Sequence, residues 1–184
     1  MADKGEWELA TILREMHNIT GFRFSLHDTG FRELAAYPAQ GARYCRCVQQ
    51  SREGLNRCRE NDREAFECVK KKPEVYTYRC RFGLCEAVAP LYIRGALTGY
   101  LMMGQAIDGQ PGSRETLLQN GAECTADLRA LELAVKEVPV CGRDKIVSCL
   151  KVLDVCAQYI TLSHLLDGGC GDVSEQVQAY LERH

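Results

Sequence analysis

The stretch that decides the fold reads Cys85-Glu-Ala-Val-Ala-Pro-Leu-Tyr-Ile93, then Arg94-Gly95, then Ala96-Leu-Thr-Gly-Tyr-Leu-Met-Met-Gly-Gln-Ala-Ile107. Both long runs are rich in the apolar, β-branched and aromatic residues that favour strands, and the two residues between them fit a tight hairpin. Gly99 and Gly104 interrupt the second run, which indicates a β-bulge or the close approach of another group to the backbone. The stretch predicts a β-hairpin in an antiparallel sheet.

Further strands are expected on the N-terminal side of this hairpin. Residues 75–80 read as one strand, and residues 22–26 alternate apolar side chains before a turn that lets residues 31–37 return. The segments between the strands have helical periodicity. Helices are expected at 6–17, at 48–72 with a break near Glu53-Gly54, at 114–137 with a break near Asn120-Gly121, and at 143–166. The pattern predicts an α+β fold in which helices cover one face of a five-stranded antiparallel sheet.

The composition is that of one ordinary globular domain. The chain has 184 residues, 46% of them hydrophobic and 26% charged, with a formal net charge of −2. This apolar content excludes a disordered chain, and no apolar run of about 18 residues is present to span a membrane. The start, MADKGEWELATILREM, is charged and amphipathic, unlike a signal peptide. We therefore expect a cytoplasmic protein with reduced cysteines and no membrane partner.

Cysteine is the unusual component, with 11 residues in the chain. Six of them fall between residues 45 and 85, and three interpretations are open for this group. The thiols pack in the core or line a pocket, or they bind Zn or Fe, or they form a redox sensor next to neighbouring arginines. Their spacing lacks the Cys-x2-Cys pairs typical of metal sites. The six are Cys45, Cys47, Cys58, Cys68, Cys80 and Cys85.

Catalytic motifs are missing from the sequence. It has no Gly-x-x-x-x-Gly-Lys phosphate loop, no Gly-x-Gly-x-x-Gly and no His-Glu-x-x-His. Its four histidines are scattered, and only His27 lies in the sheet region, where a cysteine nucleophile would need a partner. The sequence therefore predicts a protein that is not an enzyme.

Five ordered elements are more specific than composition. They are Tyr44-Cys45, Gly54-Leu-Asn-Arg-Cys58, Val75-Tyr-Thr-Tyr78-Arg-Cys80-Arg-Phe-Gly83-Leu84, Ala89-Pro90-Leu-Tyr-Ile and Gly99-Tyr-Leu-Met-Met-Gly104-Gln105. In this order they resemble the PocR-type sensory domain over about residues 6–166. The resemblance implies a PAS-like fold that senses small hydrocarbon derivatives such as propanediols. The family's motif positions are occupied by Cys45, Cys58, Cys80, Gly83, Leu84 and Gln105, whereas Cys47, Cys68 and Cys85 do not follow its pattern.

A pocket between sheet and helices would suit a small, diol-like ligand if apolar walls surrounded a few hydrogen-bonding groups. The candidate hydrogen-bonding residues are Tyr78 and Gln105. The candidate wall residues, each with the core as its alternative place, are Tyr44, Phe66, Leu84 and Met103. Near the pocket mouth we expect Cys45, Cys58 and Cys80. These three cysteines either bind a metal (Zn or Fe) or simply pack there. Cys45 and Cys80 are also candidates for contact with the ligand.

The end of the sequence predicts how a signal leaves the sensor. An apolar stripe favours a homodimer through the 143–166 helix. The stripe consists of Ile146, Cys149, Leu150, Leu153, Cys156, Ala157 and Ile160. We expect a sensory domain at 1–166, a glycine-rich hinge at 167–171, and at 172–184 a segment that resembles the first helix of an AraC-type DNA-binding domain. DNA would then be bound only through a domain absent from this chain.

Three functions remain open at this point. The first is a small-molecule sensor of a bacterial AraC-type transcriptional regulator, in which a cavity receives the signal. The alternative is a cysteine-based metal or redox sensor of the same kind of regulator, in which the thiols receive it. The third is a purely structural dimerisation module.

Overall fold

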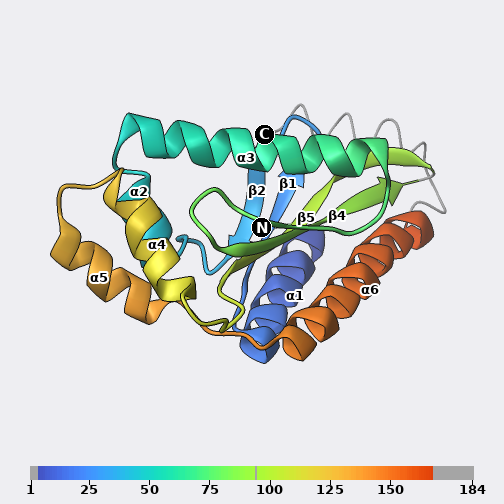
Figure 1. The fold of residues 1–184 in the computed structure, drawn as a ribbon. Helices are drawn as coiled ribbons and strands as arrows, with labels where there is room; N and C mark the ends of the chain where they lie inside the picture. Colours follow the sequence, from blue (N-terminus) through green and yellow to red (C-terminus); the bar gives the residue numbers. More distant parts are fainter. Residues whose placement is uncertain (1–3, 94, 168–184) are drawn as a thin grey trace.

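The computed structural model describes residues 4–93 and 95–167, with the side chains of 11–92, 95–142 and 144–158. Helices and strands follow one another in groups along these residues, and the strands pair antiparallel, which confirms the α+β prediction (Figure 1). The helices are α1 (Lys4–Thr20), α2 (Arg43–Val48), α3 (Arg52–Lys71), α4 (Ser113–Ala122), α5 (Leu128–Glu137) and α6 (Arg143–Asp167). The strands are β1 (Arg23–Asp28), β2 (Glu33–Tyr37), β3 (Tyr76–Arg79), β4 (Cys85–Ile93) and β5 (Ala96–Ala106). Among the described helices, none is long and apolar enough to cross a membrane.

The strands form one antiparallel sheet of five strands in the order β2-β1-β5-β4-β3. The predicted hairpin pairs β4 with β5, from Ile93 opposite Ala96 to Cys85 opposite Ala106. The β1-β2 hairpin belongs to the same sheet, because β1 pairs with the other edge of β5 although the two strands are far apart in sequence. The predicted five-stranded antiparallel sheet is therefore confirmed.

Helices cover both faces of this sheet (Figure 1). Side chains alternate along β1, so that Phe24 and Leu26 point to the face that α1 and α6 cover. Ser25 and His27 point to the opposite face, where Phe66 of α3 packs on the His27 ring with 5.2 Å between ring centroids. The expectation of helices on one face was wrong in this detail, because both faces of the central strands carry apolar side chains that need cover.

The apolar stripe of α6 is buried against the sheet. Cys149, Leu153 and Ala157 lie in the same core cluster as Phe24 and Leu101 of the strands. The described part of the stripe therefore covers the sheet. The width of the stripe alone is then no reason to expect a dimer through this helix.

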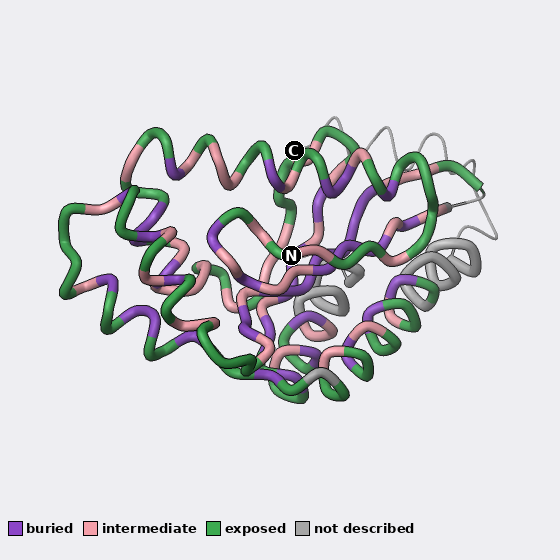
Figure 2. The backbone as a smooth tube through the Cα atoms, in the orientation of Figure 1, coloured by how far each residue is buried: buried purple, intermediate pink, exposed green. Residues whose placement is uncertain are grey.

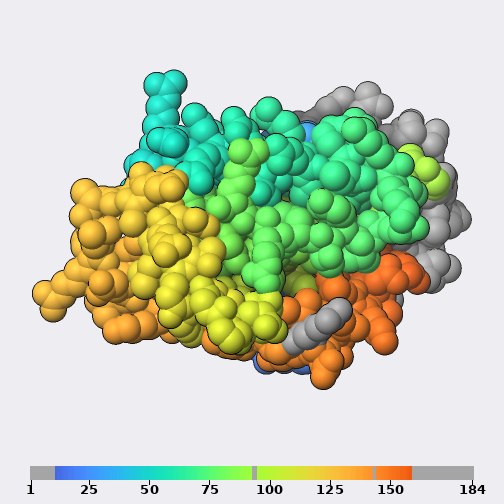
Figure 3. Space-filling model, viewed as in Figure 1, coloured from blue at the N-terminus to red at the C-terminus, as the bar shows by residue number. Residues whose placement is uncertain are grey.

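A second core cluster lies beyond one end of the sheet, where α2, α4 and α5 pack together (Figure 1). In the space-filling view the atoms of α4 and α5 lie against each other at this end of the molecule (Figure 3). Tyr44 of α2 is fully buried there. Its hydroxyl donates a hydrogen bond of 2.7 Å to the Leu117 carbonyl and lies 3.2 Å from the Phe82 carbonyl. Buried residues line the inner sides of these helices, and exposed ones line the outer sides (Figure 2). The cluster holds α2 beside the end of the sheet.

The boundary between α2 and α3 differs from the prediction. The helices are separated at residues 49–51, ahead of the break expected near Glu53-Gly54. Ser51 caps α3, because its Oγ accepts a hydrogen bond of 2.9 Å from the Gly54 N–H. A capping serine fixes the start of a helix, whereas a glycine in the first turn costs only about 1 kcal/mol.

Candidate functional site

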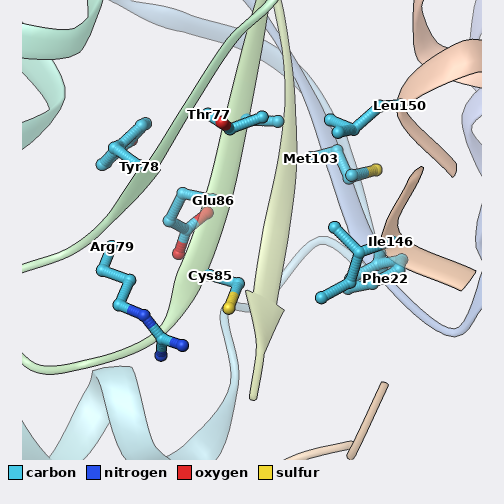
Figure 4. A pocket seen from close by; sticks show the side chains of 10 residues that line it. Phe22, Thr77, Tyr78, Arg79, Cys85, Glu86, Met103, Ile146 and Leu150 are labelled. Atoms are coloured by element: carbon cyan, nitrogen blue, oxygen red, sulfur yellow. The ribbon is translucent and has the colours of Figure 1, made fainter. Parts of the chain in front are cut away.

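Two hollows lie beside the sheet, and Glu86 and Met103 line both. One, of about 330 Å³, opens between the β3-β4 edge and α6, where Ile146 and Leu150 form part of an apolar wall (Figure 4). The other, of about 210 Å³, lies between the sheet and the helices α2 and α3, and we call it the α3 cavity. Its polar lining residues are Arg23, Ser25, His27, Glu33, Cys45, Arg46, Gln49, Asp62, Glu86 and Gln105. The α3 cavity is the candidate site because its walls offer many hydrogen-bonding groups around a small space.

Glu86 is the most enclosed acid of the α3 cavity. It stands on β4 opposite Gly104 of β5, where a Cβ would overlap its carboxylate, so glycine provides the space that the acid occupies. Burial raises the pKa of Glu86 well above its ordinary value, and the charge of Asp62 raises it further. None of the ion pairs formed by the described residues includes Glu86.

Gln105 links Glu86 to α2 through a β-bulge. The register shifts between Cys85 and Glu86 of β4, which leaves Gln105 as an extra residue in β5 with a φ of 70°. The Gln105 N–H donates a hydrogen bond to the Glu86 carboxylate. The Gln105 Oε1 accepts a hydrogen bond of 2.6 Å from the Ala42 N–H, just before α2. Both expectations for the interrupted strand, a bulge and a close approach at Gly104, are therefore confirmed.

Asp62 brings a second acid into the cavity from α3. Its Oδ1 accepts a hydrogen bond of 3.2 Å from the Tyr78 hydroxyl of β3. Burial raises the pKa of Asp62 to about 6, although this hydrogen bond acts in the opposite direction. Burial, with the charges of Glu86 and Asp62, also raises the pKa of Tyr78, which therefore remains a donor. Asp62, like Glu86, takes part in no ion pair with a described residue.

The two cationic side chains of the cavity bind partners other than Asp62 and Glu86. Nη2 of Arg23 lies 2.9 Å from each carboxylate oxygen of Glu33. Arg46 donates a hydrogen bond of 2.7 Å to the exposed side chain of Gln40. Both guanidinium groups thus have hydrogen-bond partners, whereas the two inner acids form no ion pair with a described residue and feel only the charge of Arg23 from a distance.

The structure places the predicted ligand-binding residues in different environments. Cys45, Met103 and Gln105 line the α3 cavity, and their binding role stays a prediction. Tyr78 lines the hollow beside α6 and reaches Asp62 with its hydroxyl (Figure 4).

The remaining predicted wall residues are part of the core, which was their alternative place. Tyr44 and Leu84 belong to the cluster around α2, α4 and α5. Phe66 stacks on Phe31, with 4.9 Å between ring centroids, and packs against Tyr100. These three residues line neither of the two hollows.

Cys80 is held in the turn that closes the β3-β4 hairpin. Its N–H donates a hydrogen bond of 2.8 Å to the Leu84 carbonyl, and its Sγ accepts one of 3.3 Å from the Leu84 N–H. Gly83 has a φ of 100°, as expected for the last residue of a three-residue hairpin loop. The residues of the Tyr-x-Cys-x-x-Gly-Leu element thus form and stabilise the turn between β3 and β4.

Cys45, Cys58 and Cys80 gather against the cluster of α2, α4 and α5. Burial raises the pKa of all three thiols, that of Cys80 to about 12, and Glu86 adds to the rise. A thiol that stays protonated is a poor nucleophile. In the part of the chain that the structure describes, no three His, Cys, Asp or Glu side chains are arranged to hold a metal ion. Packing is the interpretation that this geometry favours, and binding of Zn or Fe by the three cysteines stays a prediction.

Sequence reasoning missed the two acids of the cavity. Glu86 lies inside an apolar strand, and an acid at such a position is a signal that could have singled it out. Asp62 lies in a helix full of charged residues, where no local feature separates it from its exposed neighbours. Only the packing of α3 on the sheet distinguishes it.

These observations define a PAS-like α+β domain in which a sheet and a helix enclose a small polar cavity. The family model of the sensory domain found in PocR matches residues 7–165. The chain therefore belongs to the PocR sensory domain family, a sensory and not a catalytic one, which fits the expectation of a non-enzyme. None of the curated proteins matched the chain.

The tail is not part of this match. The comparisons give no support to an AraC-type segment at 172–184. That segment, Cys170 and all but the first residue of the predicted 167–171 hinge lie outside the described residues.

Proposed function

We propose that the chain is the small-molecule sensory domain of a transcriptional regulator and that its ligand binds in the α3 cavity. The observation that carries this proposal is a hollow of about 210 Å³ between sheet and helix, lined by hydrogen-bonding side chains. Drug-sized ligands fill about 300–1,000 Å³, so this cavity suits a smaller molecule. A short hydrocarbon derivative with hydroxyl groups, of about the size of a propanediol, matches both its volume and its lining.

Neutral groups in the cavity are suited to hydroxyl groups of a ligand. Ser25 Oγ and His27 Nε2 lie 3.0 Å apart on β1. Burial lowers the pKa of His27, so that its ring is neutral at physiological pH and offers both a donor and an acceptor. Met102, whose side chain packs on the α3 face of the sheet, supplies an apolar wall for the carbon chain.

Binding is tested by thermal denaturation of the whole chain with a panel of small alcohols, diols, amino alcohols and aldehydes. A ligand at 100 times its dissociation constant should add about 2.7 kcal/mol of stability. Cys45→Leu fills part of the cavity and is expected to remove this gain. Cys68→Leu makes the same replacement at an exposed cysteine of α3 and should keep it. A panel without any stabilising compound, or an equal gain in the Cys45→Leu variant, contradicts the proposal.

We further propose that the signal leaves through α6 in a homodimer and continues to a DNA-binding domain of the AraC type. α6 packs on β4, the strand that carries Glu86, so a displacement of β4 reaches α6 directly. The outer side of α6 exposes Val152 and Val155, which a two-fold contact would bury. Sedimentation should show a dimer that Val155→Asp dissociates and that Val140→Asp, at an exposed position outside α6, leaves intact. A monomeric parent chain contradicts this relay.

A further inference from the structure

The charged side chains that line the α3 cavity leave it one positive charge short. Three carboxyl groups face two guanidinium groups: Glu33, Asp62 and Glu86 against Arg23 and Arg46. The imbalance is local, because Arg23 pairs with Glu33 and Arg46 turns to an exposed glutamine. The two acids that form no ion pair with a described residue are therefore Asp62 and Glu86, which come from opposite walls of the cavity, α3 and β4. The charge of Arg23 acts on both acids, but its guanidinium group is bound to Glu33.

The protein satisfies these two acids only in part. Asp62 accepts a hydrogen bond from the Tyr78 hydroxyl, and Glu86 accepts one from the Gln105 N–H. A carboxylate has about four acceptor sites, so most of them remain available on the cavity side. An enclosed carboxylate needs either a proton or a cation, because transfer from water without either is costly.

An organic cation fits this need better than a metal ion. Among the described residues, no His, Cys, Asp or Glu cluster is arranged to hold a metal. A primary ammonium group brings one positive charge and three N–H donors, enough to bind carboxylates on two walls at once. A hydroxyl group of the same size brings one donor and no charge.

We propose that the ligand of the α3 cavity carries an ammonium group seated between Glu86 and Asp62, so that small amino alcohols bind in preference to diols of the same size. This inference rests on the proposed function, since it assigns a chemical class to the ligand of the same cavity. The hydroxyl group of the ligand then meets the neutral pair of Ser25 and His27 on β1.

Two pairs of nearly isosteric compounds test the assignment by calorimetric titration of the whole chain near neutral pH. Ethanolamine is compared with ethylene glycol, and isopropanolamine with propylene glycol. We expect each amino alcohol to bind at least about tenfold more tightly than its diol, the factor of one charge-assisted hydrogen bond. Glu86→Gln keeps the size of the side chain and should abolish the preference. Glu132→Gln, at an exposed position on α5, should leave it unchanged.

The outcomes separate the two proposals. A diol that binds as tightly as its amino alcohol overturns the ammonium assignment and leaves the sensory function standing. Binding of none of the four compounds, together with no response to the wider panel, overturns the sensory function as well. If Glu86→Gln does not fold, Asp62→Asn gives the same readout from the other wall. A full preference in the folded variant contradicts the inference.

Discussion

Replacing Asp62 by asparagine is expected to stabilise the domain at neutral pH. The acid is enclosed between α3 and the sheet, where burial raises its pKa from 3.8 to about 6. Asparagine removes the charge and keeps an oxygen that accepts the hydrogen bond from the Tyr78 hydroxyl. The substitution therefore isolates the free energy cost of the buried charge.

The size of the effect follows from the linkage of protonation to folding. Asp62 binds its proton more tightly in the folded chain, so stability falls as the pH rises from 3.8 to about 6. Above this window the full penalty of about 3 kcal/mol is present, at about 1.36 kcal/mol per pKa unit. Below it both states are protonated and the penalty disappears. Asp62→Asn should thus gain up to about 3 kcal/mol above the window and almost nothing below it.

Urea denaturation followed by circular dichroism measures this gain at a pH above and a pH below the window. Asp154→Asn is the matched control, since Asp154 is exposed on α6 and accepts a hydrogen bond of 2.8 Å from Gln158 that asparagine can also accept. The control should change little at either pH. An Asp62→Asn variant with the same stability change at both pH values, or with a loss at both, would refute the reasoning.

Three further substitutions or reactions test single contacts. Gly104→Ala should lower the free energy of unfolding in urea by about 1–3 kcal/mol, because the added Cβ meets the Glu86 carboxylate. Gly142→Ala places its Cβ in open space and should lower it by less than about 1 kcal/mol. Equal losses in the two variants would contradict the close packing at Gly104. Tyr44→Phe should lower the free energy of unfolding by about 1–3 kcal/mol, because it removes the hydrogen bond to the Leu117 carbonyl. Tyr37→Phe, at a more exposed position, should leave the stability unchanged. An unchanged stability of Tyr44→Phe would show that this hydrogen bond contributes nothing. In thiol labelling of the folded chain, exposed Cys68 should react before Cys45, whose pKa burial raises, and the reverse order would contradict the enclosed site.

Local sequence pattern was sufficient to predict the elements and the class of the fold. The hairpin around Arg94-Gly95 and the alternation in 22–26 each depend on residues close in the chain, and both appear in the structure. The boundary between α2 and α3 was misjudged from the pattern, because the capping side chain of Ser51 fixes the start of α3. Helices on both faces could not be predicted, because a strand flanked by apolar residues does not reveal which helix packs on which side.

The candidate site was less accessible to sequence reasoning because long-range packing creates it. Gln105 was identified by its position in a motif, but its role depends on a bulge that places its N–H beside Glu86. Glu86 and Asp62 become significant only when β4 and α3 meet, and no local spacing predicts that contact. Aromatic residues such as Phe66 suggested a pocket wall, whereas their contacts with each other fill the core.

Backbone amide NMR spectra recorded during titration with isopropanolamine test the central claim most directly. Ligand binding in the α3 cavity predicts that the largest shifts arise at Gly104, Gln105 and residues of α3 near Asp62, at concentrations that also stabilise the chain. Shifts centred on Ile146 and Leu150, which line the other hollow, or no saturable shifts with any compound of the panel, would contradict it.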